Sequence, residues 1–352
     1  LGLDTHVGKA VETCQLELLA ETVGVRPALH VGDAGDDVGK ARALSLEQRR
    51  YIQQHAIDLC IEVVDVHGRA TLIDARRPGH MEGDLVGTVL PKLHAANIEM
   101  IGRFDFSKIN EKFAAEHPEW LYVNEKGEKV NYNGQVHTCL MGGYQQDYMC
   151  QILDEAVTKY PLDGIFFNMI GFPRTDYSRV FHGVCQCENC EKSFEEYCGL
   201  DLPRHDGDAR ALAKLKAWQR IQIDAQFRRV RELVKSIRPN IAICTYTDEH
   251  IDVIRKESGQ PTGEGHWGNF ERAQWTLLNN PTRQLANASV HFHQMIFRHS
   301  GVAPHLHTRR LWQLMMSGAW LDFYCIGPLQ RLEDRAGLGP AGDVYRFHAA
   351  NE

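Results

Sequence analysis

Three cysteines stand close together in the run CQCENC, as Cys185, Cys187 and Cys190. Thiolates at such spacing can share one metal ion if a fourth ligand joins them. We predict that Cys139 is that ligand, with Cys198 as the alternative. Four thiolates would fill the tetrahedral shell of a zinc ion, so the zinc would be structural and would leave no open position for a substrate. The other interpretation is a set of reduced thiols without a metal.

A second group of residues has the chemistry of sugar hydrolysis. That reaction uses one carboxylic acid to protonate the leaving oxygen and one carboxylate as nucleophile or base. The candidate catalytic carboxylates are Glu257, Asp105 and Glu264. The candidate substrate-binding residues follow strand-like segments or lie in a glycine-rich loop, and they are Arg103, Asn168, Arg255, His266, Trp267, Arg298 and His299. Any one of these side chains could instead cap a helix or form a structural ion pair.

The segments that must position these residues alternate between strand and helix. Apolar runs predict strands at 59–66, 98–106, 164–170, 241–247, 251–254, 288–296 and 321–327, and helical spacing predicts helices at 46–56, 86–96, 144–160, 209–237 and 308–320. This order favours a parallel sheet with helices outside it.

We therefore predict an α/β protein, a (β/α)8 TIM barrel with long βα loops, as one domain over residues 1–352 in which 1–45 are poorly defined. In such a barrel the polar residues at the carboxyl ends of the strands would converge on one face. A doubly wound sheet is the competing architecture, but the glycine-rich turn that it normally carries after its first strand is not found in the spacing of Gly32, Gly35 and Gly39.

Composition limits the partners. The net charge is -7, from 46 acidic and 39 basic residues, which disfavours a nucleic-acid partner and is compatible with a neutral carbohydrate. No apolar run approaches the roughly 20 residues that cross a membrane. We expect no organic cofactor and allow a homo-oligomer. Several of the 10 cysteines lie in apolar runs, where reduced, buried thiols are expected, so we predict a reducing, cytoplasmic location.

The histidines offer a further metal site. His291 and His293 alternate along one strand-like segment and would face the same side. No acidic residue or cysteine stands at matching spacing on that segment, so a metal-dependent hydrolase is the least favoured function.

An ordered set of motifs resembles a known family. The motifs are RFDFSK at 103–108, EHPEW at 116–120, HTC at 137–139, DGIFFN at 163–168, IRKES at 254–258, FRHSGVAP at 297–304 and LDFYCIG at 321–327. Over residues 80–348 they resemble hypothetical glycosyl hydrolases related to the barrel-type alpha-L-fucosidases. The CQCENC run, with Cys139 upstream, is similar to the zinc cluster of the family that holds many microbial beta-galactosidases.

The resemblance implies a glycoside hydrolase that acts on a terminal, fucoside-like or galactoside-like sugar. In the related fucosidases the nucleophile is a carboxylate at the end of the fourth strand, where this chain has Asn168. An amide cannot form the glycosyl ester, so either another carboxylate serves, or the reaction is inverting, or the protein only binds carbohydrate. Glu257 matches the sixth strand, where those fucosidases often keep their acid/base. The resemblance thus implies Glu257 as general acid, with Asp105 or Glu264 as its partner.

Overall fold

The structure is a computed structural model that describes residues 85–95, 99–168, 170–176, 178–247, 249–258, 265–293, 300–325 and 333–351. Its contacts divide the chain into two compact units. Unit 1 holds Leu1–Asp58, Pro91–Met100 and Asp252–Glu352, and unit 2 holds Leu59–Leu90 and Ile101–Ile251. Helix α4 (Leu85–Ala95) agrees with the helix expected at 86–96. The elements expected at 46–56 and 59–66 lie outside the described residues.

Unit 2 is built on three parallel strands, β1 (Ile101–Asp105), β5 (Gly164–Asn168) and β6 (Ala242–Thr245). Their order is β1-β5-β6, and the register places Asp105 beside Asn168 at the carboxyl ends. Every residue of β5 and β6 is buried, as the uninterrupted apolar runs predict for parallel strands. The strands expected at 98–106, 164–170 and 241–247 are confirmed with small shifts at their ends.

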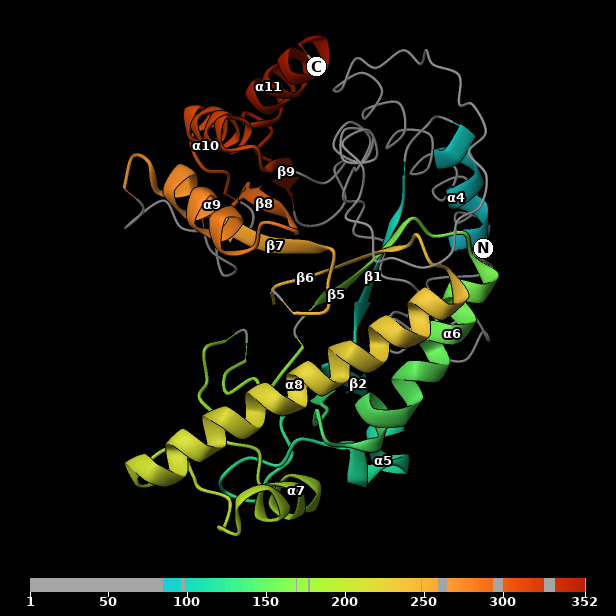
Figure 1. Ribbon diagram of the computed structural model, residues 1–352, viewed down its shortest axis with the longest axis vertical. Coiled ribbons are helices and arrows are strands. Elements are labelled where there is room, and N and C mark those ends of the chain that lie inside the picture. The colour runs from blue at the N-terminus through green and yellow to red at the C-terminus, as the bar shows by residue number, and fades with distance from the viewer. Residues whose placement is uncertain are drawn as a thin grey trace. The chain divides into compact units, whose positions relative to one another are not determined.

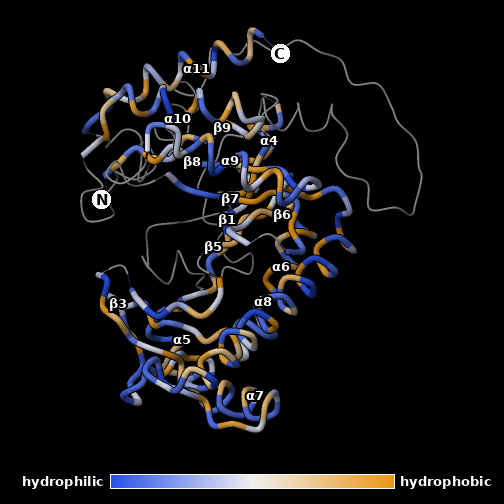
Figure 2. The backbone as a smooth tube through the Cα atoms, turned by 60° about the vertical axis from the view of Figure 1, so that its left-hand side comes forward, coloured by the Kyte–Doolittle hydropathy of each residue, from blue (hydrophilic) through white to orange (hydrophobic). Residues whose placement is uncertain are grey.

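Helix α8 (Ala209–Ile237) runs beside α6 (Met149–Lys159) (Figure 1). It begins at Asp208, whose carboxylate accepts hydrogen bonds from the backbone N–H groups of Arg210 and Ala211. Hydrophobic and hydrophilic residues alternate along it (Figure 2), and its apolar side buries Leu215, Trp218, Phe227, Val230 and Val234. Both ends of the predicted helix 209–237 are confirmed, because a capping aspartate precedes it and a proline follows it. The helix predicted at 144–160 consists of a π-helical turn, Tyr144–Tyr148, followed by α6.

Unit 2 also has a small antiparallel sheet, β2 (Lys108–Asn110), β4 (Gln135–His137) and β3 (Asn131–Tyr132), in that order. The hairpin between β3 and β4 turns at Asn133 and Gly134, which have φ angles of 51° and 81°. An Asn-Gly pair with two positive φ angles suits the tight turn of a β-hairpin. The other short elements are α5 (Glu111–Glu116), a 3-10 turn at Pro118–Trp120 and α7 (Glu188–Cys198).

Unit 1 holds the parallel strands β7 (Val253–Ser258), β8 (Gln284–Val290) and β9 (Trp320–Tyr324), in the order β7-β8-β9. Helices α9 (Gly268–Asn279) and α10 (Pro304–Ser317) pack on this sheet, and α11 (Leu338–Ala350) packs on α10 (Figure 1). The described chain is thus α/β with six parallel strands, three in each unit. No helix in the described ranges is long and apolar enough to cross a membrane.

Several boundaries in unit 1 differ from the prediction. The strand expected at 251–254 begins at Val253 and continues to Ser258, so Arg255 and Glu257 lie within it. The charged residues in RKES interrupt the apolar run, so the sequence did not predict this extension, although only some of these residues are exposed. The strand expected at 288–296 is β8 at 284–290, and the helix expected at 308–320 is α10 at 304–317. The last strand, β9 at 320–324, matches the one expected at 321–327 apart from its ends.

A candidate metal centre and two polar strand ends

Four buried cysteines meet in unit 2. The sulfur atoms of Cys139, Cys185, Cys187 and Cys190 all lie within 4.8 Å of one another. The Sγ atoms of Cys139 and Cys190 are 3.3 Å apart, and those of Cys187 and Cys139 are 3.5 Å apart. All four are free thiols. Among the described residues this is the group of histidine, cysteine or acidic side chains that could hold a metal ion.

Helix α7 and the segment after β4 position the thiols. Cys187 is the N-cap of α7 and Cys190 lies in its first turn, so the two side chains share one end of the helix. The N-terminal end of a helix favours negative charge, which suits thiolates. Helix α7 ends at Gly199, whose φ of 68° is a left-handed conformation that glycine adopts without strain. Cys139 lies two residues after β4, and its backbone N–H donates to the carbonyl of Trp120 at 2.8 Å.

Backbone N–H groups point at two of the sulfurs. Val123 N donates to Cys185 Sγ at 3.5 Å, and Met141 N donates to Cys139 Sγ at 3.3 Å. Hydrogen bonds with the other three thiols lower the pKa of Cys187 and raise the pKa of Cys190, and those with Cys185 and Cys187 raise the pKa of Cys139.

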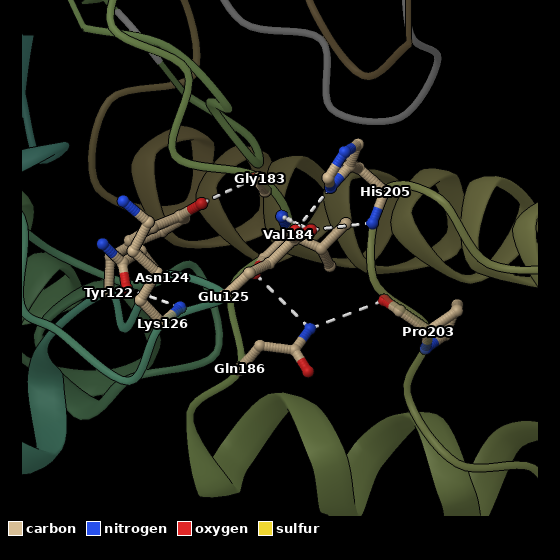
Figure 3. Close-up of polar contacts among 9 residues, drawn as sticks. All are labelled: Tyr122, Asn124, Glu125, Lys126, Gly183, Val184, Gln186, Pro203 and His205. Carbon is tan, nitrogen blue, oxygen red and sulfur yellow. Dashed lines mark hydrogen bonds and ion pairs between the residues drawn. The ribbon is translucent and has the colours of Figure 1, made fainter.

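The carboxylate of Glu125 holds the loop that carries Cys185. It contacts the backbone of Val184 and His205 (Figure 3). One oxygen of Glu125 accepts from Val184 N and from His205 N, each at 2.7 Å, and the other contacts His205 Nδ1 at 2.5 Å. Burial tends to raise the pKa of Glu125, but these hydrogen bonds outweigh it and lower the pKa. Tyr122 adds a hydrogen bond from its hydroxyl to Gly183 O at 2.7 Å.

The donor set fits a metal such as zinc. The four thiols are buried in one core with Tyr122, Phe194, Leu215 and Trp218 and receive backbone N–H bonds. Cys198, the alternative ligand, instead donates its thiol to Phe194 O at 3.5 Å within α7. The structure thus brings together the four cysteines that the sequence proposed, and Cys139 is the fourth member.

A polar cluster lies at the carboxyl ends of β1 and β5. Asp105 Oδ1 accepts from Ser107 N at 3.0 Å and from Ser107 Oγ at 2.5 Å, and Asn168 Nδ2 donates to Asp105 Oδ2 at 3.2 Å. Phe167 packs against Phe227 of α8, so the alternating side chains of Asn168 and its neighbour Asp105 point to the face away from α8. Arg103 shares that face, two residues earlier on β1. The structure thereby brings Asp105 and Asn168 into direct contact.

The same cluster contains residues that the sequence did not single out. Lys108 stands opposite His137 in the antiparallel ladder, and both side chains are buried. Burial, and then Lys108, lower the pKa of His137 to about 4, so the ring is neutral near pH 7. Thr138 ties the ladder to β1, donating its Oγ1 to Phe106 O at 2.5 Å and its backbone N–H to Ser107 O at 2.9 Å. The HTC motif was the available signal, because it places His137 two residues before a metal-ligand candidate.

Helix contacts assign the two faces of β7, β8 and β9 in unit 1. Ser258 donates to Asn269 of α9 at 2.5 Å, and Ser289 bonds to His307 of α10 at 2.8 Å. Residues one position away therefore point to the face opposite α9 and α10. On that face Arg255 Nη2 lies 3.3 Å from Asp322 Oδ2, and Arg255 Nε lies 4.0 Å from Glu257 Oε1. The guanidinium is thus nearer to Asp322 than to Glu257.

Of the two histidines considered as a metal pair, His291 and His293, the first lies in a hydrogen-bonded chain. His291 Nδ1 meets His307 Nε2 at 3.3 Å, and His291 Nε2 meets the carbonyl of Asp334 at 2.7 Å. A carbonyl only accepts, so His291 donates from Nε2 and accepts at Nδ1 when neutral. His307 then donates from Nε2 and accepts at Nδ1 from the Ser289 hydroxyl. Both ring nitrogens of His291 are engaged in this chain, which ties β8 to α10 and to the segment after β9.

The remaining candidates are distributed as follows. His266 and Trp267 precede α9, where Trp267 is exposed and packs edge-on against Phe270, while His266 bonds to α10 through Gln313. Glu264, Arg298 and His299 lie outside the described residues.

Comparison with known proteins shows similarity to glycoside hydrolases. Residues 62–169 match the family described as hypothetical glycosyl hydrolase 6. No curated protein matches the chain. Among solved structures, alpha-L-fucosidase isoenzyme 2 from Paenibacillus thiaminolyticus is similar over 77% of this chain and 40% of its own, with 21% identity and a TM-score of 0.57.

Two other solved structures extend this likeness. The beta-galactosidase from the psychrophilic Marinomonas ef1 is similar over 86% of this chain and 57% of its own, with 11% identity and a TM-score of 0.61. The PgaB (BpsB) glycoside hydrolase domain from Bordetella bronchiseptica is similar over 75% of this chain and 80% of its own, with 9% identity and a TM-score of 0.54. The chain has the fold of glycoside hydrolases. It spans about half the length of the fucosidase and the galactosidase.

Proposed function

We propose that the protein is a glycoside hydrolase that cleaves a terminal sugar, fucoside-like or galactoside-like. The observation that carries the proposal is the position of Glu257, at the carboxyl end of β7 on the face of a parallel sheet opposite α9 and α10, in a chain with a glycosidase fold. Catalytic residues of barrel glycosidases come from the carboxyl ends of their strands. The proposal includes closure of the six strands, with two more, into one eight-stranded barrel domain.

Glu257 is the general acid in this proposal. Its side chain is 35% exposed and lies 4.0 Å from Arg255 Nε, whereas the 3.3 Å contact of Arg255 is with Asp322. Asp322 is therefore the nearer partner of this cation. Asp105 and Glu264 are the partner carboxylates that the sequence suggests. Sugar hydroxyls would bind to Arg103, Asn168, Arg255, His266, Trp267, Arg298 and His299.

The cysteine cluster holds a structural zinc ion in this proposal. Cys139, Cys185, Cys187 and Cys190 supply all four positions of a tetrahedral site, so zinc would supply folding energy and no chemistry. Thr138 bonds to the β1–β2 connection and precedes Cys139, so the cluster would also fix the backbone around Ser107.

The test is turnover of nitrophenyl glycosides, beginning with the alpha-L-fucoside and the beta-D-galactoside. We expect Glu257→Gln to lower kcat/KM about 100-fold or more on a substrate with a poor leaving group, because a general acid contributes on that order. A dinitrophenyl glycoside needs little protonation and should lose much less. Glu232→Gln, on the exposed side of α8, is the matched control. Equal losses on both substrates would contradict an acid role for Glu257.

A non-catalytic carbohydrate-binding protein is the second candidate. Asn168 favours it, because an amide that donates to Asp105 stands where the related fucosidases have a nucleophile. Binding of free sugars by calorimetry, together with no turnover of any glycoside in the panel, would select this function.

A further inference from the structure

The register of unit 1 places two carboxylates in one row. Glu257 of β7 pairs with Ala288 of β8, and Ala288 pairs with Asp322 of β9. Side chains in register on neighbouring strands point to the same face. That face is the one opposite α9 and α10, because Ser258 and Ser289, one position along from Glu257 and Ala288, bond to these helices.

The separation across this row suits two carboxylates that work together. Neighbouring strands are about 4.8 Å apart, so the backbones of Glu257 and Asp322 are about 10 Å apart. Inverting glycosidases hold their two carboxyl groups about 6.5–9.5 Å apart to admit a water, and retaining enzymes hold them about 5–5.5 Å apart. Ala288, between them, carries only a methyl group and is fully buried. The row itself thus has only a methyl group between its two acids.

Arg255 connects the two acids. Its guanidinium lies 3.3 Å from Asp322 and 4.0 Å from Glu257, and it lies 5.9 Å from the ring centre of Tyr324. The side chains of Arg255 and Asp322 are 5% and 8% exposed, whereas Glu257 is 35% exposed. Asp322 is therefore the buried anion of an ion pair, and Glu257 is the carboxyl group that solvent and a leaving group can reach.

Trp320 adds a buried hydrogen-bond donor on the same face. It stands two residues before Asp322 on β9, and its side chain points to the same side. The residue is 4% exposed, and its Nε1–H is buried without a hydrogen-bond partner in the described ranges. An indole N–H only donates, and a buried donor is costly unless an acceptor meets it. A sugar hydroxyl held near Asp322 would supply such an acceptor.

We propose that Asp322 is the catalytic base that works with Glu257, in an inverting hydrolysis; this rests on the proposed glycosidase function. Water attacks the anomeric carbon and gives its proton to Asp322. The bond from that carbon to the glycosidic oxygen breaks, and its electron pair stays on the oxygen, which takes the proton of Glu257.

The experiment begins with the full chain and a glycoside that the wild-type protein cleaves. Proton NMR of the first sugar released should show the inverted anomer. Asp322→Ala should lower kcat about 100-fold or more, on the scale of general-base catalysis. Azide should restore at least one tenth of the lost activity by attacking in place of activated water, giving a glycosyl azide of inverted configuration. Asp343→Asn, an exposed acid in the same unit, is the matched control.

A purely structural Asp322 would behave differently. Azide would then restore nothing, and no glycosyl azide would form. Because Asp322→Ala removes the 3.3 Å partner of a buried cation, Arg255→Gln/Asp322→Asn is compared with Arg255→Gln alone. Activity of that double variant within fivefold of the single variant would overturn the proposal, as would a retained anomer from the wild type. Absence of any wild-type turnover would instead overturn the glycosidase function itself.

Discussion

The two units place reactive side chains in different ways. In unit 2 the cysteine cluster is assembled by one short run and one preceding turn, and three of its four thiols fall within residues 185–190. In unit 1 the row of Glu257, Ala288 and Asp322 is assembled by pairing of three separate strands. The first arrangement is local in sequence and the second depends on register. Substitutions in the two regions should therefore disrupt the protein in different ways.

The largest effect is expected from the cysteine cluster. Cys187→Ser removes one thiolate, and a structural zinc site supplies about 10–16 kcal/mol of apparent binding energy in small peptides. We expect loss of bound zinc and a thermal midpoint lower by more than 10 °C in scanning calorimetry. Cys198→Ser, in the same helix but bonded only to Phe194 O, should keep both zinc content and midpoint. Absence of zinc in wild-type protein purified without chelators would contradict the zinc assignment.

Next in size is the buried ion pair of unit 1. Arg255→Leu leaves Asp322 buried without its 3.3 Å partner, and breaking such a pair costs about 3–5 kcal/mol. Arg220→Leu is the comparison, because Arg220 and Glu249 are 82% and 53% exposed and 3.8 Å apart. An exposed pair contributes about 0–1 kcal/mol. Urea unfolding of both variants gives the contrast, and equal losses would show that Arg255 is not held by Asp322.

A smaller, graded effect is expected from pH in unit 1. Burial, then His291 and Arg310, lower the pKa of His307 to about 3, while Asp334 acts in the opposite direction. Below pH 6.5 the unfolded histidine binds a proton and the folded one does not, so stability falls as pH drops toward 3. The slope from this residue is about 1.4 kcal/mol per pH unit, and it vanishes above pH 6.5. His307→Gln should remove this part of the slope in urea unfolding at pH 5 and pH 7.

Sequence reasoning recovered what depends on local pattern. The length of α8 followed from its apolar spacing and the proline after it, and the four cysteines followed from their spacing. Asp105 and Asn168 were placed at strand ends because apolar runs stop there. Asp322 was missed, although it stands inside the quoted motif LDFYCIG, because its value comes from pairing with β8 and contact with Arg255. Helix α9 and the β3–β4 hairpin were missed because polar residues interrupt their periodicity.

The smallest predicted effect tests the local half of this contrast. Asp208 caps α8 by accepting from Arg210 N at 2.9 Å and from Ala211 N at 3.0 Å. Asp208→Ala leaves these donors to water, and loss of an N-cap costs about 0.5–2 kcal/mol. Asp206→Ala, two residues earlier in an exposed turn, removes the same charge without a cap, so it separates capping from net charge. Urea unfolding should show the loss for Asp208→Ala alone. Asp208→Asn should keep most of the stability, since its amide oxygen can accept the same bonds, and equal losses for alanine and asparagine would assign the effect to charge.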